Sequence, residues 1–232
     1  MAGRRIVVTG GTAGIGLAIA RSLRGQGHGV FICGRNQQRL ESALSDLKGA
    51  GGAVCDVRDL SSVERMIVAA KRHLGGLDGL VNNAGTAFIK DFEEITPAMW
   101  AEIIETNLTG IFNCCYAALP ALKEAGRQGG LADIVNIGSR SGRYAIRGGV
   151  GYNTTKFGLQ GFTEAMFLDL NRYGIRVGLV APGTVSTGFG GTPRADGQLR
   201  PEDVGEAVVA MIGARAGASM NWVELRPARP PA

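Results

Sequence analysis

This sequence lacks long apolar runs, basic clusters and aromatic platforms, and each absence counts against a class of function. No apolar run reaches the roughly 20 residues of a membrane-spanning helix. The apolar stretch that begins at Ile6 is too short for the core of a signal peptide, so we expect a cytoplasmic protein. No run of Lys or Arg exceeds two, and only 6% of the residues are aromatic, so nucleic-acid binding is a weak third possibility.

The sequence also lacks metal-binding motifs and any compositional break between domains. None of its four cysteines, Cys33, Cys55, Cys114 and Cys115, has metal-ligand spacing. We interpret them as small buried residues in a reducing compartment. The formal net charge is +5, but the basic residues are scattered, which indicates a generally basic surface compatible with phosphorylated ligands. Without a Pro/Ser-rich linker, we expect residues 1–232 to form one domain.

Short apolar runs alternate with amphipathic stretches along the whole chain. The apolar runs lie at 6–8, 30–33, 53–55, 79–81, 134–137, 176–180 and 222–225. Helical patterns lie at 15–23, 37–47, 60–74, 97–125 with a break, 152–172 and after 201. This alternation predicts an α/β fold, a doubly wound parallel sheet with helices on both faces and right-handed crossovers.

In such a sheet, ligands bind beyond the carboxyl ends of the strands. The chemically suggestive residues of this chain all fall at those ends: Thr9, Arg35, Asp56, Asn82, Ser139 and Pro182. Their convergence at one edge is stronger support for a ligand site than any single motif.

The segment Thr9-Gly10-Gly11-Thr12-Ala13-Gly14-Ile15-Gly16 joins the first predicted strand to the first predicted helix. Glycines there allow a tight turn, and the unpaired N–H groups of the helix N-terminus suit a pyrophosphate. A chance cluster is the alternative in a chain of 37 glycines, but the position between strand and helix favours a dinucleotide site. A P-loop is excluded because Gly-Lys-Ser/Thr is missing. We expect the cofactor to contact Gly10, Thr12, Gly14, Ile15 and Gly16.

The end of the second strand bears on which dinucleotide binds. NAD sites commonly place an acidic residue there, whereas an arginine suits the 2′-phosphate of NADP. This chain has Arg35 and no acidic residue before Glu41. The guanidinium of Arg35 can form paired hydrogen bonds with a phosphate, so we favour NADP(H) over NAD(H). The alternative is a solvated arginine at the start of a helix.

Tyr152 and Lys156 lie four residues apart, with Ser139 thirteen residues before the tyrosine. On a helix this spacing places a phenol and an ammonium on one face. A neighbouring cation stabilises a phenolate, so we expect Lys156 to lower the pKa of Tyr152 and make proton exchange with a carbonyl or alcohol feasible. Such a pair also occurs by chance on solvated helices, so its surroundings decide the interpretation.

With these motifs, the chain resembles the short-chain dehydrogenase/reductases over essentially its full length. The matching residues occur in the order of that family: Thr9-Gly10 with Gly14 and Gly16, Asp56, Asn82-Asn83-Ala84-Gly85, Asn107, Ser139, Tyr152 with Lys156, and Pro182-Gly183. The resemblance is to the ketoreductase branch. It implies a Rossmann-type sheet of seven strands in the order 3-2-1-4-5-6-7, and a homodimer or homotetramer.

The resemblance also implies the role of each matched residue. Asp56 would bind the adenine amino group beside Val57, while Asn83, Ala84 and Gly85 would support the cofactor pocket. Val185 and Thr187, after Pro182 and Gly183, would contact the nicotinamide carboxamide. Ser139 would hydrogen-bond the substrate carbonyl, Tyr152 would exchange its proton, and Lys156 would also bind the nicotinamide ribose. Asn107 would hold a water that links Lys156 to solvent, unless it only kinks or caps a helix.

The expected function is therefore reversible NADP(H)-dependent reduction of a small or carrier-bound carbonyl compound, such as a 3-oxoacyl thioester or another ketone. The alternatives are an NADPH-binding sensor or scaffold without turnover, or an NAD-dependent alcohol dehydrogenase. The short glycine-rich loop at 188–197 is expected to order over bound substrate. Arg140, Arg143 and Arg147 could attract an acidic substrate, or could be ordinary surface arginines.

The chain departs from carrier-protein reductases at its C-terminus. It ends in Met220-Asn221-Trp222-Val223-Glu224-Leu225 without an Asp-Gly-Gly turn, and a proline-containing tail at 227–232 follows that we expect to be extended. This departure counts against a specific ketoacyl substrate and against the usual tetramer contacts. Dimer formation through the helical regions at 97–125 and 152–172 stays compatible with it.

Overall fold

Seven parallel strands form one sheet in the order β3-β2-β1-β4-β5-β6-β7, which confirms the predicted order. The computed structural model describes residues 3–127, 131–191 and 195–228. The strands are β1 Arg5–Thr9, β2 Gly29–Gly34, β3 Gly51–Val54, β4 Gly79–Asn82, β5 Ala132–Ile137, β6 Ile175–Pro182 and β7 Trp222–Leu225. Residues 192–194 of the expected loop and 229–232 of the expected tail lie outside the described residues.

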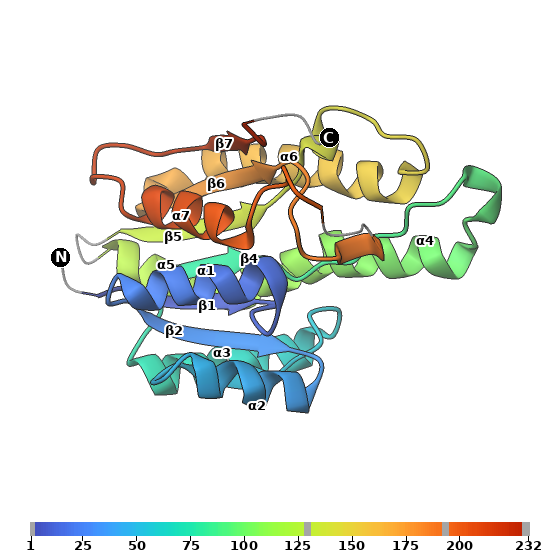
Figure 1. Cartoon of the computed structure of the whole chain (residues 1–232). Coiled ribbons are helices and arrows are strands. Elements are labelled where there is room, and N and C mark those ends of the chain that lie inside the picture. Colours follow the sequence, from blue (N-terminus) through green and yellow to red (C-terminus); the bar gives the residue numbers. More distant parts are fainter. Residues whose placement is uncertain (1–2, 128–130, 192–194, 229–232) are drawn as a thin grey trace.

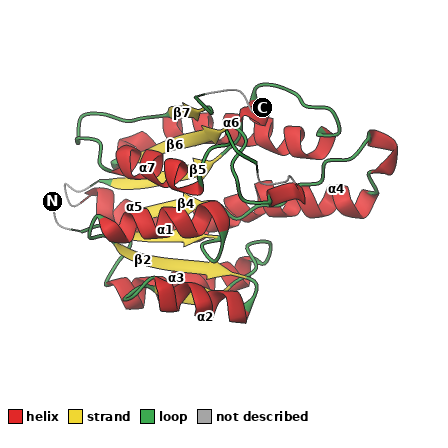
Figure 2. Ribbon diagram, viewed as in Figure 1, coloured by secondary structure: helices red, strands yellow, loops and turns green. Residues whose placement is uncertain are grey.

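Helices cover both faces of this sheet (Figures 1 and 2). They are α1 Gly14–Gly25, α2 Gln37–Asp46, α3 Leu60–Leu74, α4 Pro97–Ile104, α5 Gly110–Arg127, α6 Val150–Leu170 and α7 Pro201–Ile212. One core layer joins the sheet to α3, α5 and α6, and the other joins it to α1, α2 and α7. Within the described residues, no helix combines the length and apolarity needed to cross a bilayer.

The strand residues alternate between the two core layers. On β1, Ile6 and Val8 pack into the layer of α1 and α7, whereas Val7 packs into the layer of α3 and α5. All three side chains have no exposed surface. Because successive strand residues point to opposite faces, a strand covered on both sides is apolar at most of its positions. This requirement explains why the strands appear in the sequence as continuous apolar runs.

The break expected within the helical region 97–125 is a π-helical turn. It is η2, Glu105–Thr109, between α4 and α5, and the N–H of Gly110 donates to the carbonyl of Glu105, five residues back. Isolated π-turns inside helices often accompany functional sites. Here the turn carries Asn107, whose side chain is buried with 1% of its surface exposed.

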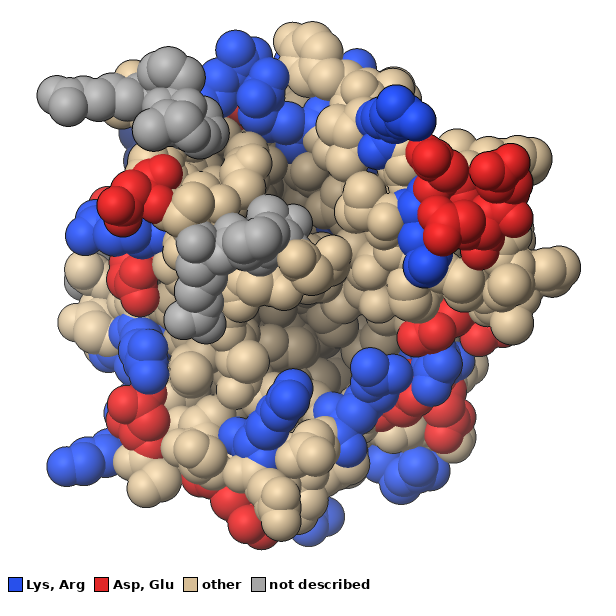
Figure 3. All heavy atoms as spheres, turned by 45° about the vertical axis from the view of Figure 1, so that its right-hand side comes forward, with Lys and Arg blue, Asp and Glu red and all other residues tan. Residues whose placement is uncertain are grey.

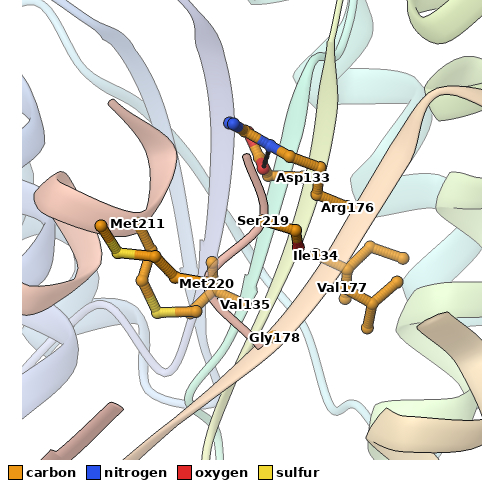
Figure 4. A pocket seen from close by; sticks show the side chains of 9 residues that line it. All are labelled: Asp133, Ile134, Val135, Arg176, Val177, Gly178, Met211, Ser219 and Met220. Carbon is orange, nitrogen blue, oxygen red and sulfur yellow. Dashed lines mark hydrogen bonds and ion pairs between the residues drawn. The ribbon is translucent and has the colours of Figure 1, made fainter. Parts of the chain in front are cut away.

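The edge of the sheet at the amino ends of the strands is fastened by a buried ion-pair network. Asp133, at the start of β5, accepts hydrogen bonds from Arg4 and Arg176. Arg176 also donates to the carbonyls of Ile212 and Ala214 at the end of α7. Figure 4 shows Asp133 and Arg176 close together, with Met211 and Met220 nearby in the same small pocket. The residues expected to act on a substrate lie at the opposite ends of the strands.

Candidate active site

The chemically suggestive side chains meet at the carboxyl edge of the sheet. Ser139 follows β5, and Tyr152 and Lys156 lie in the first two turns of α6. Figure 3, with the right-hand side of Figure 1 turned forward, shows a hollow whose visible lining is mostly uncharged. Lys and Arg side chains lie around its rim. The structure therefore brings Ser139, Tyr152 and Lys156 together, as their order along the chain led us to expect.

The phenol of Tyr152 is largely shielded from solvent. Burial raises its pKa, and a hydrogen bond with the side chain of Ser139 opposes this shift. From the sequence we expected Lys156 to lower this pKa, and the net direction in the structure is the opposite. The physical reason is that burial disfavours the phenolate more than the Ser139 contact favours it. Tyr152 is therefore protonated at neutral pH, which is the state that a proton donor requires.

Lys156 is buried beneath Tyr152. Its Nζ lies 5.6 Å from the centre of the Tyr152 ring and donates a 2.9 Å hydrogen bond to the carbonyl of Ile137, the last residue of β5. Burial lowers the pKa of Lys156 to about 8, because few surrounding groups replace the water that solvates an exposed ammonium. The strand that leads to Ser139 thus also holds the lysine.

The side chain of Asn107 ties η2 to two other parts of the site. Its Nδ2 donates to the carbonyl of Thr86 at 2.9 Å and to Oγ1 of Thr155 at 3.1 Å. Its Oδ1 accepts from the N–H of Thr86 at 2.8 Å. Sequence reasoning missed Thr155, although it directly precedes Lys156. Because both amide N–H groups already have partners, a water bound at Asn107 would rely mainly on the main chain of this turn.

Asn153 was also missed, although it follows Tyr152 directly. Its buried Nδ2 donates to the carbonyls of Ser141 and Tyr144 at 2.6 and 3.2 Å, and its Oδ1 accepts from the N–H of Ile146. These bonds attach the loop after Ser139 to the first turn of α6. Only the tertiary contact with that loop marks this asparagine as part of the site.

Phe189 is a third residue that sequence reasoning did not single out. It begins η5, Phe189–Gly191, a short 3₁₀ turn in the expected loop. Its ring centre lies 6.3 Å from that of Tyr152, and 45% of its surface is exposed. An aromatic residue in a glycine-rich loop carries no sequence signal for such a contact.

The glycine-rich loop has the geometry that a pyrophosphate requires. Gly10 and Gly14 have φ of +63° and +51°, which side chains disfavour. A Cβ on Gly16 would lie 2.3 Å from the carbonyl oxygen of Gly10. No side chain caps the N-terminus of α1, and its first turn has no acidic residue. The free N–H groups and the close backbone approach therefore fit a dinucleotide phosphate.

The segment after β4 forms hydrogen bonds with the glycine-rich loop. Nδ2 of Asn83 donates to the carbonyls of Thr9 and Gly10 at 3.0 and 3.1 Å. Oγ1 of Thr9 accepts from the N–H groups of Asn83 and Ala84. Gly85 lies against Asn107, where a Cβ would meet Oδ1 at 3.2 Å. These contacts hold the loop in shape, in keeping with the supporting role expected for this segment.

The segment after Pro182 reaches the other side of the phosphate loop. The N–H of Gly183 donates to the carbonyl of Leu225, and Val185 pairs with Leu199. The methyl group of Thr187 lies 3.5 Å from where a Cβ on Gly14 would be. Thr187 is thus placed beside the start of α1, near the expected nicotinamide end of a bound dinucleotide.

The expected adenosine end contains an ion pair that the sequence did not predict. Arg58 donates to the Asp56 carboxylate through Nε and Nη2, and Arg58 is the first cause of the lowered pKa of Asp56. The side chain of Val57 is buried against Gly110 in the core. Arg35 is exposed at the end of β2 and, within the described part of the chain, makes no hydrogen bond or ion pair.

The three arginines after Ser139 have partners within the chain. Arg140 forms an ion pair with Glu224, and the guanidinium of Arg143 lies 4.2 Å from the ring centre of Trp222. Arg147 pairs with Asp91 at 3.5 Å on the exposed rim. Their intramolecular partners favour a structural interpretation over the binding of an acidic substrate.

Comparison with known proteins agrees with this geometry. Residues 4–197 match the family described as short chain dehydrogenase. A provisionally named ketoacyl reductase of Streptomyces coelicolor is 40% identical in an alignment of 185 residues that covers 78% of this chain and 70% of that protein. Sulfoacetaldehyde reductase 2 of Chromohalobacter salexigens is 33% identical in an alignment of 240 residues, gaps included, that covers 97% of this chain and 94% of that protein. The structure of an actinorhodin polyketide ketoreductase variant with NADPH superposes with a TM-score of 0.88 at 31% identity, covering 98% of both chains.

Proposed function

The chain belongs to the short-chain dehydrogenase/reductase family of oxidoreductases that act on CH–OH and C=O groups, and on that premise we propose that it reduces a ketone with NADPH. The observation that carries this proposal is the meeting of Ser139, Tyr152 and Lys156 at the sheet edge that also carries the phosphate loop. A protein that only bound the dinucleotide would need the phosphate loop and not the buried phenol and ammonium.

In the proposed reaction, the hydroxyl of Ser139 donates a hydrogen bond to the substrate carbonyl oxygen. This bond stabilises the negative charge that develops there during reduction. Tyr152, held protonated by burial, then transfers its proton to that oxygen. Because the two side chains lie within hydrogen-bonding reach of each other, we expect both hydroxyls to donate to one carbonyl oxygen. NADPH, when bound, supplies the hydride.

We propose two roles for Lys156 in this reaction. Its ammonium stabilises the phenolate left after proton transfer, and it orients the nicotinamide ribose through hydrogen bonds. The π-turn that carries Asn107 would hold the water through which the proton is replaced. The Asn107 side chain would act indirectly, because its hydrogen bonds to Thr86 and Thr155 fix the shape of that turn.

Preference for NADP(H) over NAD(H) is the finer part of the proposal. Arg35 is exposed beyond β2, without a hydrogen bond or ion pair in the described part of the chain, and is free to bind a 2′-phosphate. The nearest carboxylate expected at this end, Asp56, is already paired with Arg58 and would repel that phosphate less than a free carboxylate would. These charges support NADPH, and binding measurements with both nucleotides test the preference.

For the substrate, we propose a ketone flanked by an apolar group. Ile89 and Ile146 are both more than two-fifths exposed, and Phe189 lies against Tyr152. The two isoleucine-bearing loops are joined by a hydrogen bond from the N–H of Lys90 to the carbonyl of Gly148. These exposed apolar side chains suit a hydrophobic acyl or ring system, free or carrier-bound, and one relative of this chain is named a ketoacyl reductase.

We further propose that two copies of the chain associate through α5 and α6. Four large apolar side chains stand exposed on these helices: Phe112, Tyr116, Phe157 and Leu168. Exposed apolar side chains that group together on a surface often mark a protein–protein interface. Sedimentation analysis of Leu168→Lys beside the parent chain tests this, with a shift to monomer expected and an unchanged mass contradicting it.

The decisive test of function is NADPH oxidation, followed at 340 nm, against a panel of carbonyl compounds. The panel contains apolar ketones such as α-tetralone, β-ketoacyl thioesters, and small anionic carbonyls such as sulfoacetaldehyde. We expect turnover with the first two groups and little with the third. Tight NADPH binding without oxidation of any member would refute the enzyme assignment and support a sensor.

A further inference from the structure

The loop that carries Ser139, residues 138–149 between β5 and α6, is here called the serine loop. It is attached to the rest of the protein on two sides. Asn153 of α6 holds it from one side through three hydrogen bonds. On the other side it contacts β7, the last strand, which lies beyond residue 197, where the family match ends. This second attachment depends on residues in the C-terminal segment that departs from carrier-protein reductases.

Glu224 is the centre of the contact with β7. Its carboxylate lies 3.4 Å from Nε of Arg140 and also pairs with Arg226. The Glu224 side chain is only 17% exposed, whereas those of Arg140 and Arg226 are 38% and 55% exposed. One shielded carboxylate therefore faces two arginines: it accepts a hydrogen bond from Arg226 at the end of its own strand, and it forms an ion pair, without a hydrogen bond to Nε, with Arg140 of the serine loop.

Neighbouring contacts extend the same attachment. The Arg143 guanidinium stacks on Trp222, and Arg226 hydrogen-bonds the side chain of Tyr144. The side-chain stem of Arg140 passes Gly183, whose N–H donates to the carbonyl of Leu225. β7 is thus linked both to the serine loop and to the segment after β6.

We propose that Glu224 is a positioning residue that holds Ser139 in place through Arg140. The proposal rests on the proposed function, since it assigns Ser139 to the substrate carbonyl. Arg140 directly follows Ser139, so a displacement of its side chain is transmitted to the serine by a single peptide unit. Without the carboxylate, Arg140 and Arg226 would be two like charges side by side, and their repulsion would push the loop away from β7.

The test is the Glu224→Gln variant, which removes the charge and keeps the shape of the side chain. In hydrogen–deuterium exchange, we expect the amides of Gly142, Arg143 and Tyr144 to exchange about five- to tenfold faster. These amides donate to the carbonyls of Ser139 and Arg140 in the parent chain. Amides in the first turns of α1 should exchange as before, and the melting temperature should change little.

The kinetic readout is kcat for reduction of the best ketone of the panel. The groups that act on the substrate carbonyl must be aligned with it to within about 1 Å. We therefore expect Glu224→Gln, which would displace Ser139, to lower kcat about three- to tenfold. The NADPH dissociation constant should stay close to the parent value, because β1, which leads into the phosphate loop, is separated from β7 by three strands of the sheet. Glu224→Asp, which keeps the charge, should recover part of the loss.

The matched control is Asp46→Asn, which breaks the ion pair between Arg21 and Asp46 on α1 and α2, far from the serine loop. It should leave loop exchange and kcat unchanged. Unchanged exchange in Glu224→Gln overturns the proposal, as does a loss of kcat matched by equal losses in NADPH binding and melting temperature. If the parent chain reduces no carbonyl, the proposed function fails, while the exchange measurement still decides whether Glu224 holds the loop.

Discussion

Replacing Tyr152 by phenylalanine removes one hydroxyl from the centre of the proposed site. The ring, its contact with Phe189 and the buried position of Lys156 all stay. What is lost is the proton donor, and a positioned general acid contributes about 10²- to 10⁴-fold to a rate. At about 1.4 kcal/mol per tenfold change, this raises the barrier by about 3–5 kcal/mol.

The same substitution should hardly affect the fold. Within the described residues, Ser139 is the side chain that hydrogen-bonds this hydroxyl, and a single such bond contributes about 1 kcal/mol. The phosphate loop lies on other elements, so NADPH should bind as before. The expected pattern is a loss of kcat of at least about a hundredfold with an intact nucleotide site.

The assay measures kcat and KM for ketone reduction, with NADPH affinity determined separately by the fluorescence of the bound nucleotide. Tyr173→Phe is the matched control, because it removes the hydroxyl of a tyrosine in the 3₁₀ turn Asn171–Tyr173 that precedes β6, at the opposite end of the strands from the site, and it should keep parent activity. Turnover of Tyr152→Phe within about threefold of the parent chain would refute the proton-donor assignment, since no general acid contributes so little.

Four further predictions concern cofactor preference, the pH dependence of activity and of stability, and the buried ion-pair network. Arg35→Asp should shift preference from NADPH toward NADH, because it replaces a phosphate-binding charge by one that repels phosphate; equal preference in variant and parent kinetics would contradict it. Because burial lowers the pKa of Lys156 to about 8, kcat/KM for reduction should fall above that pH as the ammonium is lost, and a flat profile to pH 10 would count against it. Between pH 8 and 10.5, the ordinary pKa of a lysine, the unfolded chain still binds the proton that Lys156 of the folded chain has released. The free energy of unfolding should therefore rise with pH over this range, and urea titrations at each pH can measure it. Asp133→Asn should cost about 3–5 kcal/mol of unfolding free energy by leaving two arginines without their carboxylate, and a loss under about 1 kcal/mol in urea unfolding would show that the network is dispensable.

The order of the sheet was predictable from the sequence because it depends on local patterns. The apolar run at Ile6–Val8 must be buried on both faces, and a helix separates each such run from the next, so parallel pairing with crossovers is the arrangement that satisfies both. The glycine-rich loop before α1 was equally predictable, because the left-handed backbone at Gly10 and Gly14 is a conformation that glycine adopts far more readily than other residues.

The electrostatics of the site were not predictable in the same way. The spacing of Tyr152 and Lys156 led us to expect that the lysine lowers the pKa of the phenol, whereas burial raises it. Burial depends on what the rest of the chain places around Tyr152, including Phe189 from a loop 37 residues further along the sequence. The spacing of two residues along a helix does not show how deeply other segments bury them.

The sequence by itself determined the elements of this protein, their order in the sheet and the candidates for the reacting groups, because these follow from residue type and spacing along one segment. Only the tertiary structure decided how the groups are held. Asn153 and Glu224 reach the serine loop from α6 and β7, and Asn107 reaches Thr86 and Thr155 from a π-turn. Such contacts join residues far apart in the chain, and they exist only once packing has closed the distance between them.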